Sequence, residues 1–326
     1  MPLAVSLRAA YPNARISWLV QDSFRAAIAA HPAVNEVVPF PRDRWRRWWT
    51  PSSVLEATRW LRSLRGRFDF VVDAQGLGRS GLIAYATRAP RRIGFADARE
   101  FGRLGVNERY RIDARHAVDR MLGLLVAAGV PAVRDLRLHL AESDRTWWRG
   151  RRDELALRSY AVFAPSARWP SKAWPAERWS ALAAKVLERG YERVVYVGSA
   201  AEREQVAASL PDGAARERAV DLAGATSVGQ GMAVIADAQL VIANDSAPLH
   251  MAVGFERPLL ALFGPTDPAA VGPYGRDACV LRGAEAIAFR GSYRDRSLGD
   301  RLMRGIGVDD VVRALDSDMH RAGVSR

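Results

Sequence analysis

The stretch Leu240–Gly275, LVIANDSAPLHMAVGFERPLLALFGPTDPAAVGPYG, decides the fold class of this 326-residue chain. An apolar run over 240–243 ends in Asn244-Asp245-Ser246, and a helical pattern follows. A second apolar run, 258–263, ends in the sequence GPTDP. The pattern predicts a strand, a helix and a second strand, with polar residues where both strands end. In open α/β sheets, ligands bind in the crevice outside these carboxyl ends.

The start of the predicted helix is a candidate phosphate site. Asp245 or Ser246 can cap the helix, whose free N–H groups would then suit a phosphate. Ser246 and His250 are four residues apart, so they share one face of the helix. The alternative is a capped helix between two core strands, with a solvated histidine.

Apolar runs and helical patterns alternate along both halves of the chain, which predicts an α/β fold with two doubly wound, Rossmann-like sheets. The charged stretch 142–159 marks the boundary between a domain at 1–150 and a domain at 151–326, which ends in an amphipathic helix over 308–320. Strands are expected at 16–20, 34–40 and 68–74 in the first domain and at 161–164, 193–197 and 220–222 in the second.

The first domain opens with a helix, in which Leu3, Leu7 and Tyr11 share one face. A doubly wound domain normally opens with a strand, because the turn after that strand carries a binding loop. The first strand of the N-terminal domain is therefore expected to be missing.

Composition excludes several classes of protein. No run of eighteen residues is apolar enough to span a membrane, and the start of the chain lacks the pattern of a signal peptide. The single cysteine, Cys279, excludes an internal disulfide and a cysteine-based metal cluster. The net charge of +12 suggests an anionic partner, which could be nucleic acid, a membrane surface or a phosphorylated substrate. No nucleic-acid-binding signature is found, so a cytosolic protein without a nucleic-acid partner is expected.

Further polar residues follow predicted strands of the second domain. Lys172, in a loop that also carries Ser166, can neutralise a diphosphate as a point charge. Glu202, or its neighbour Glu204, can accept hydrogen bonds from ribose hydroxyls. The alternatives are a solvated loop lysine and ordinary surface glutamates.

The first domain offers candidate residues for binding an anionic group. Gln75 lies in the run after the strand at 68–74, and Arg99 in an irregular segment over 97–100. The stretch RWRRWW over 44–49 places Arg44, Arg46 and Arg47 among tryptophans. This composition suits an anionic membrane surface or a glycolipid. Nucleic-acid stacking and a solvated loop are the alternatives.

The pair Asp316 and Asp318 matches the Asp-x-Asp of metal-dependent glycosyltransferases. It lies on the predicted final helix, where residues two apart diverge. A solvated helix face is therefore expected, with no metal site.

The opening stretch resembles the donor-site signature of glycosyltransferase family 9, the ADP-heptose:lipopolysaccharide heptosyltransferases. The resemblance rests on NDSAPLH over 244–250, on FGPTDP over 263–268 and on KAWPAERW over 172–179. Ala247 stands where the family usually has glycine. The resemblance implies a GT-B arrangement, in which two domains face a cleft, the first binding the acceptor and the second the nucleotide sugar. It implies donor contacts from Ser166, Lys172, Glu202, Asp245, Ser246, Ala247 and His250.

The same resemblance implies an inverting transfer of heptose from ADP-heptose to a lipopolysaccharide precursor, without a metal or other cofactor. The expected location is cytoplasmic, with peripheral contact at the inner membrane. The family's catalytic base is an aspartate in a turn after the first strand, and here only Met1-Pro2 of that motif is present. The base and about 15–25 further residues are therefore expected before Met1. The alternatives are a catalytically silent ADP-sugar-binding protein and a related transferase with another nucleotide sugar.

Overall fold

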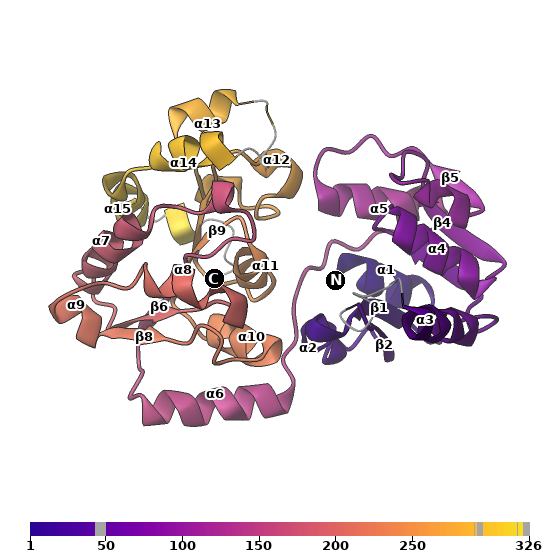
Figure 1. The fold of residues 1–326 in the computed structure, drawn as a ribbon, viewed down its shortest axis with the longest axis horizontal. Coiled ribbons are helices and arrows are strands. Elements are labelled where there is room, and N and C mark those ends of the chain that lie inside the picture. Colours follow the sequence, from indigo (N-terminus) through magenta and orange to yellow (C-terminus); the bar gives the residue numbers. More distant parts are fainter. Residues whose placement is uncertain (43–49, 290, 292–295, 318, 322–326) are drawn as a thin grey trace. The chain divides into compact units, whose positions relative to one another are not determined.

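The computed structural model describes residues 1–326 except 43–49, 290, 292–295, 318 and 322–326 (Figure 1). Contacts divide the chain into two units. Unit 1 comprises Met1–Arg25 and Pro32–Asp135, and unit 2 comprises Ala26–His31 and Leu136–Arg326. The short helix α2 (Ala26–Ala29) therefore belongs to unit 2, although the residues on both sides of it belong to unit 1.

Unit 2 contains a parallel six-stranded sheet in the spatial order β11-β10-β9-β6-β7-β8. Counted along the chain, this is the order 6-5-4-1-2-3 of a doubly wound dinucleotide-binding fold. The first strand of the unit, β6, lies in the middle. The strands are β6 (Tyr160–Ala164), β7 (Arg193–Tyr196), β8 (Ala219–Asp221), β9 (Leu240–Asn244), β10 (Leu259–Leu262) and β11 (Val280–Leu281).

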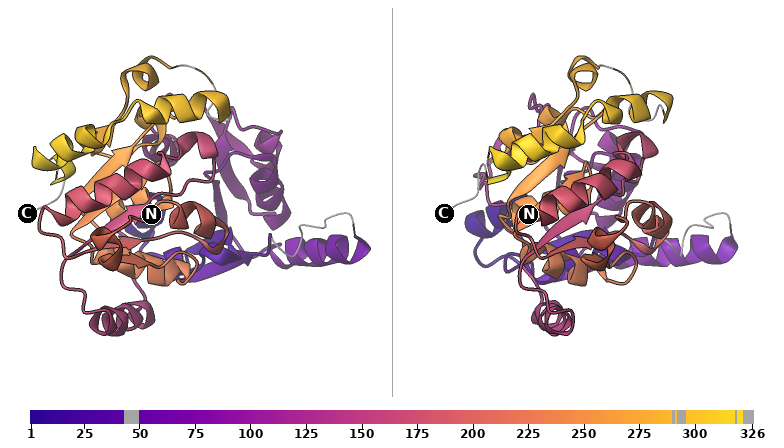
Figure 2. Two further views of the ribbon diagram at one scale, coloured as in Figure 1. Left: turned by 60° about the vertical axis from the view of Figure 1, so that its left-hand side comes forward. Right: turned by 90° about the vertical axis from the view of Figure 1, so that its left-hand side faces the viewer.

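Side chains that alternate along these strands supply a core on each face of the sheet. Phe163 and Tyr196 pack with Trp179 of α7 (Ala176–Leu187) on one face. Val162 packs on the other face, beneath α6 (Glu142–Glu154), α10 (Val228–Ala236) and α11 (Ala247–Gly254). Both faces are thus covered by helices (Figure 2), as a buried parallel sheet requires.

Further helices complete unit 2. They are η4 (Pro170–Lys172), η5 (Ala200–Glu202), α8 (Arg203–Ala207), α9 (Ala214–Glu217), α12 (Pro268–Val271), η6 (Asp277–Cys279), α13 (Ala284–Ala288), α14 (Arg296–Arg304), α15 (Val308–Asp316) and η7 (Met319–Arg321).

Unit 1 holds two separate parallel sheets, β1-β2 and β3-β4-β5. The strands are β1 (Ser17–Gln21), β2 (Glu36–Phe40), β3 (Phe70–Asp73), β4 (Arg91–Phe95) and β5 (Glu108–Tyr110). The helices are α1 (Pro2–Ala10), η1 (Asp22–Phe24), α3 (Pro51–Ser63), α4 (Gly78–Thr87), η3 (Gly102–Gly105) and α5 (Ala117–Ala127).

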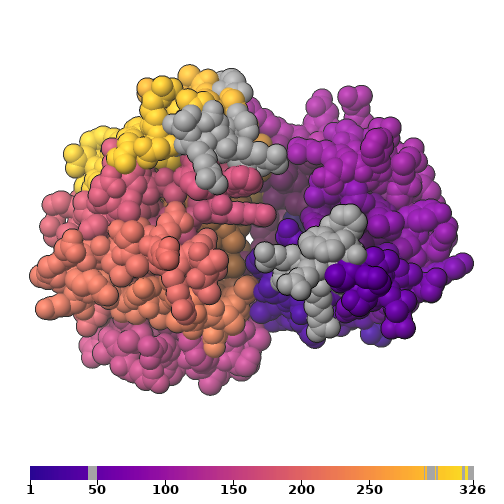
Figure 3. Space-filling view, in the orientation of Figure 1, coloured from indigo at the N-terminus to yellow at the C-terminus, as the bar shows by residue number. Residues whose placement is uncertain are grey.

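The division between the units falls at Asp135/Leu136, before the expected boundary at residue 150. The stretch expected to be a boundary is helix α6, which lies on the surface of unit 2 (Figure 3). It is anchored by Trp148, which is 2% exposed and donates from Nε1 to the hydroxyl of Tyr160 over 3.1 Å. The predicted burial of Cys279 is confirmed. Among the residues that the structure describes, no helix is both long and apolar enough to cross a membrane.

Candidate functional site

Polar side chains gather where the central strands of unit 2 end. Ser166 follows β6, Glu202 follows β7, Asp245 follows β9 and Thr266 follows β10. Because these strands are parallel, their carboxyl ends lie along one edge of the sheet. This edge is the ligand-binding side of a doubly wound fold.

An ion pair joins two of the predicted residues at this edge. Lys172, on η4, donates from Nζ to Oδ2 of Asp245 over 2.6 Å. The two side chains are only 15% and 9% exposed. The sequence predicts both residues as ligand contacts, and the structure places them together. A nearly buried cation is therefore held beside the start of α11.

Asn244, the last residue of β9, fixes the loop that carries Ser166 and Lys172. Its side chain is fully buried; Nδ2 donates to the carbonyl of Pro165 over 2.7 Å, and Oδ1 accepts from the backbone N–H of Trp174 over 3.3 Å. One side chain thus holds both ends of the loop between β6 and α7.

The first turn of α11 differs from the expectation of a side-chain cap. Ser246 is the N-cap residue, but its side chain accepts no helix N–H and instead donates to the carbonyl of Asn244 over 3.2 Å. Asp245 faces Lys172, so the expected cap is wrong. Ala247 and His250 are exposed on this helix. The positive end of the helix dipole at this turn favours an anion.

Glu202 lies beside Ser166. A Cβ atom at Gly198 would stand 3.6 Å from both Ser166 Oγ and Glu202 Cβ. Glu202 Oε2 accepts from the N–H of Ser199 over 2.7 Å and from its hydroxyl over 2.6 Å. These bonds hold the carboxylate of Glu202 at the end of β7, whereas Glu204 is exposed on α8. The geometry therefore favours Glu202 over Glu204 as the residue at the edge.

Thr266 was not predicted as a site residue. Its Oγ1 is buried, and it has no hydrogen-bond partner among the described residues. A buried unpaired hydroxyl is unfavourable by about 1–3 kcal/mol, so it is a candidate contact for a ligand. The signal in the sequence was available, because Thr266 lies in the GPTDP run directly after an apolar strand.

In unit 1, the structure brings Gln75 and Arg99 to the end of the β3-β4 pair. Both side chains are exposed, and the N–H of Arg99 donates to the carbonyl of Gly76 over 2.9 Å. Asp73 shapes this turn, accepting from the N–H groups of Gln75 and Gly76 and from the hydroxyl of Ser80 over 3.0–3.1 Å. Three accepted hydrogen bonds give this buried carboxylate a structural role.

Further charged residues belong to the candidate acceptor side. Arg44, Arg46 and Arg47 lie outside the described residues. Near Arg99, a hydrogen bond from Arg120 lowers the pKa of Asp97 below its usual value. The loop therefore carries an ionised carboxylate beside its arginines at neutral pH.

The expectation for Asp316 as a solvated residue is supported by an exposed ion pair. Arg189 donates to both carboxylate oxygens of Asp316 over 2.8 Å. Asp318 lies outside the described residues. Within the described ranges, no group of three or more histidine, cysteine, aspartate or glutamate side chains could hold a metal ion.

The doubly wound parallel sheet, with polar residues and a partly buried lysine at its carboxyl edge, places the chain among α/β proteins of the GT-B fold class. The chain belongs to glycosyltransferase family 9 (heptosyltransferase), whose sequence pattern matches residues 57–292. This confirms the predicted family, fold class and enzyme class.

Individual heptosyltransferases are similar to this chain over most of its length. Lipopolysaccharide heptosyltransferase 1 of Pseudomonas aeruginosa is 33% identical over 297 residues, which cover 86% of this chain and 79% of that protein. Lipopolysaccharide heptosyltransferase 2 of Salmonella typhimurium is 29% identical, covering 85% and 82%. The solved structure of Escherichia coli ADP-heptose lps heptosyltransferase II matches with a TM-score of 0.75 at 25% identity, covering 98% and 93%.

Proposed function

We propose that this chain transfers heptose from ADP-heptose to a hydroxyl of an anionic lipopolysaccharide precursor, at the cytoplasmic face of the inner membrane. The names of its relatives suggest this donor and this class of acceptor. The observation that carries the proposal is the Lys172–Asp245 pair, a nearly buried cation beside a helix N-terminus.

The donor would lie along the carboxyl edge of unit 2. Its diphosphate would be neutralised by Lys172 and by the first turn of α11, with the hydroxyl of Ser166 or Ser246 as a further donor. Glu202 would accept from the ribose hydroxyls, and His250 would orient the sugar side of the site. Ala247 would allow the backbone to approach the diphosphate less closely than glycine does.

The Lys172–Asp245 pair also suggests how the charge of Lys172 is neutralised when no donor is bound. Without a ligand, Asp245 pairs with the nearly buried ammonium group of Lys172. A diphosphate would take over this role, and Asp245 would turn to hydroxyl groups of the donor sugar. The lysine would thus exchange one anionic partner for another.

The transfer itself is a direct displacement. The acceptor oxygen forms a bond to the anomeric carbon, the bond from that carbon to the β-phosphate oxygen breaks, and ADP leaves with the electron pair. The acceptor proton passes to a carboxylate base, which we do not assign within 1–326. Gln75 and Arg99, together with Arg44, Arg46 and Arg47, would contact anionic groups of the acceptor.

Calorimetric titration with ADP tests the donor site. Lys172→Ala should raise the Kd for ADP about 10–100-fold, because a charge-assisted contact worth about 1.5–3 kcal/mol is lost. The matched control is Lys185→Ala, which removes an exposed lysine paired with Glu188 on α7. Equal affinity of the two variants would contradict the assignment of Lys172.

Competition between nucleotide sugars and bound ADP identifies the donor. ADP-heptose should displace bound ADP at lower concentration than UDP- or GDP-sugars do. Release of ADP on addition of a lipopolysaccharide precursor would then support transfer. Binding of ADP-heptose without release on any lipid acceptor would favour the catalytically silent alternative.

A further inference from the structure

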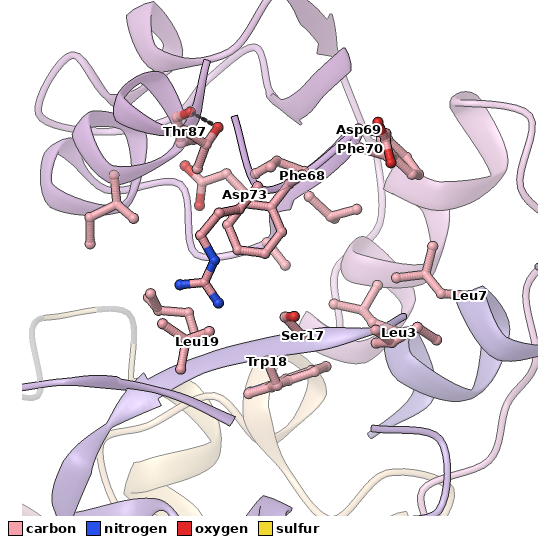
Figure 4. Close-up of a pocket in the computed structure, with 18 of the residues that line it drawn as sticks. Leu3, Leu7, Ser17, Trp18, Leu19, Phe68, Asp69, Phe70, Asp73 and Thr87 are labelled. Carbon is pink, nitrogen blue, oxygen red and sulfur yellow. Dashed lines mark hydrogen bonds between the residues drawn. The ribbon is translucent and has the colours of Figure 1, made fainter. Parts of the chain in front are cut away.

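Helix α4 of unit 1 carries apolar side chains on its outer side as well as on its inner side. Ile83, Ala84 and Thr87 are buried and line a cavity (Figure 4), where the hydroxyl of Thr87 donates to the carbonyl of Ala84 over 2.6 Å. On the outer side, Leu82 and Tyr85 are 56% and 43% exposed. They are three residues apart and share one face of the helix. A solvent-facing helix side is normally charged or polar, so this face suggests a partner.

The 3-10 helix η3 extends this apolar surface. Leu104 is 62% exposed, and Phe101, directly before η3, is 75% exposed. The backbones of the two helices are in contact, since a Cβ atom at Gly105 would lie 2.6 Å from Cα of Gly81. Consecutive Cα atoms are 3.8 Å apart, so the Cα atoms of Leu104 and Leu82 lie within about 12 Å of each other. The surface, called the α4–η3 patch, comprises Leu82, Tyr85, Phe101 and Leu104.

Arginines border the α4–η3 patch. Arg79 and Arg88 are exposed at the two ends of α4, and Arg103 is exposed on η3. The guanidinium carbon of Arg88 lies 4.2 Å from the ring centre of Tyr85. Within the part of the chain that the structure describes, none of the three arginines forms an ion pair. Neither helix contains an acidic residue, and the carboxylate of nearby Glu100 accepts from the first N–H of α4 over 3.2 Å. The border of the patch is therefore positively charged.

Phe101 combines two unfavourable features. Its φ angle of 60° lies in the left-handed region, which is rare for bulky residues. Its aromatic ring also stays largely in water, so the strained backbone gains little apolar burial in return. Strain of this kind is retained where the position of a side chain serves a function. The exposed ring is thus an independent indication that this surface meets a partner.

An anionic lipid surface fits both properties of the α4–η3 patch. Apolar side chains insert between lipid headgroups, and arginines beside them contact the lipid phosphates. A second copy of the chain fits less well. A twofold interface places the same surface on both sides, so arginines would face arginines without carboxylates between them. A nucleic acid would use the arginines but leave the exposed leucines without a partner.

We propose that the α4–η3 patch docks on an anionic phospholipid bilayer. Phe101 and Leu104 insert at headgroup depth, and the three bordering arginines contact lipid phosphates. The inference rests on the proposed function in that a lipid-linked acceptor is reached at a membrane surface. Phe101 is two residues from Arg99, a candidate acceptor contact, so docking here brings this arginine to the headgroups.

Vesicle flotation of the 1–326 chain tests the charged border of the patch. The vesicles contain phosphatidylcholine alone or with about 30% phosphatidylglycerol as the anionic lipid. Each arginine at an anionic surface strengthens binding about fivefold, so loss of three should weaken it about 100-fold. The variant is Arg79→Gln/Arg88→Gln/Arg103→Gln. Its control, Arg145→Gln/Arg149→Gln/Arg151→Gln, removes the same charge from α6, where each arginine already has a carboxylate partner. The control should stay within about threefold of the unchanged chain.

A second variant, Phe101→Asn/Leu104→Gln, tests the apolar part. Asparagine tolerates a positive φ angle, and both side chains are exposed, so the fold of unit 1 should be kept. Binding to anionic vesicles should weaken about tenfold or more, because less apolar surface enters the headgroup layer. Val126→Gln is the control, since Val126 is 57% exposed on α5, outside the patch. It should bind as the unchanged chain does.

Three results would overturn the proposal. The first is absence of binding between the unchanged chain and anionic vesicles. The second is equal binding of the patch variants and their controls, which would occur if the stretch 44–49 carried the binding. The third is a change from dimer to monomer in the patch variants with vesicle binding unchanged, which would assign the surface to a second copy.

Calorimetry with ADP keeps this test separate from that of the proposed function. The substituted residues of the patch lie in unit 1, so the Kd for ADP should be the same in the patch variants as in the unchanged chain. A chain that binds ADP and transfers heptose but does not bind vesicles would contradict the docking surface alone. A chain that binds vesicles through the patch but does not bind ADP would contradict the proposed function alone.

Discussion

Asn244 shows how one residue can control a ligand site that it does not enter. It is completely buried, and its amide holds the carbonyl of Pro165 and the N–H of Trp174. Lys172 lies between these two points in the chain. The position of the cation therefore depends on hydrogen bonds made beneath it.

Replacing Asn244 by alanine should destabilise unit 2 by about 2–4 kcal/mol, because two buried backbone groups lose their partners. The Kd for ADP should rise as well, because the loop with Lys172 is released. Urea unfolding and calorimetry measure the two effects.

Asn107 is a matched control for this change. It also makes two hydrogen bonds to the backbone, from Arg92 N–H and to the Pro90 carbonyl, both over 2.7 Å, but it is exposed. Asn107→Ala should cost no more than about 1 kcal/mol, because water replaces the lost partners. If both alanine variants lose similar amounts of unfolding free energy, the burial of Asn244 is not the reason for its stabilising effect.

At this scale, the sequence predicts residue types better than their partners. Lys172 and Asp245 were predicted because each follows a predicted strand and lies in a run that resembles the family's donor site. That they pair with one another was not predictable, because 73 positions separate them. The position of Thr266 at the end of an apolar strand is visible in the sequence, but its lack of a hydrogen-bond partner among the described residues is visible only in the structure.

The contact between α4 and η3 depends on glycines. A Cβ atom at Gly81 would lie 2.2 Å from the carbonyl oxygen of Gly102, and one at Gly105 would lie 1.8 Å from that of Gly81. The backbones therefore touch directly. Next to this contact, Glu100 and Phe101 adopt positive φ angles of 53° and 60°, which are unfavourable for residues with side chains. The packing of η3 holds this strained turn beside Arg99.

Gly81→Ala should destabilise unit 1 by about 1–3 kcal/mol through overpacking. Gly150→Ala, in α6, is the control, since the added methyl group meets no described atom within 4 Å apart from its chain neighbours and the backbone of its own helix. That variant should be stabilised by up to about 1 kcal/mol, owing to the better helix propensity of alanine. Thermal unfolding compares them, and a neutral Gly81→Ala variant would mean that η3 can move away.

Elements were predictable where apolar periodicity is strong. The strands β6, β9 and β10 are buried throughout and stand out as apolar runs. Helix α6 was mistaken for a boundary because its thirteen residues are mostly charged and only Trp148 is buried. The stretch 22–31 forms two short pieces, η1 and α2, and the chain passes from one unit to the other between them.

Each unit has its own core, so heating should give two transitions rather than one. ADP at about 100 times its Kd should stabilise unit 2 by about 2.7 kcal/mol, which raises its Tm by about 5–10 °C. Unit 1 should not shift. Differential scanning calorimetry measures both transitions. The control is Lys172→Ala, which should need more ADP for the same rise in the Tm of unit 2. A single transition would contradict independent unfolding.

At the scale of the molecule, the sequence predicted two α/β domains because strand and helix patterns alternate twice. It could not indicate which unit α2 joins, because a four-residue apolar helix can pack in either.

The location of α2 has a consequence for cutting the chain. This helix packs on α10, and His31 after it stacks edge-on against His139 with ring centroids 4.8 Å apart. The backbone therefore passes between the units at three points rather than one. A protease that cuts the chain at 135/136 would give the fragments 1–135 and 136–326. Helix α2 of the first fragment would still pack on α10 of the second. The nicked halves should stay together on a sizing column, and residues 136–326 expressed alone should expose the bare face of α10.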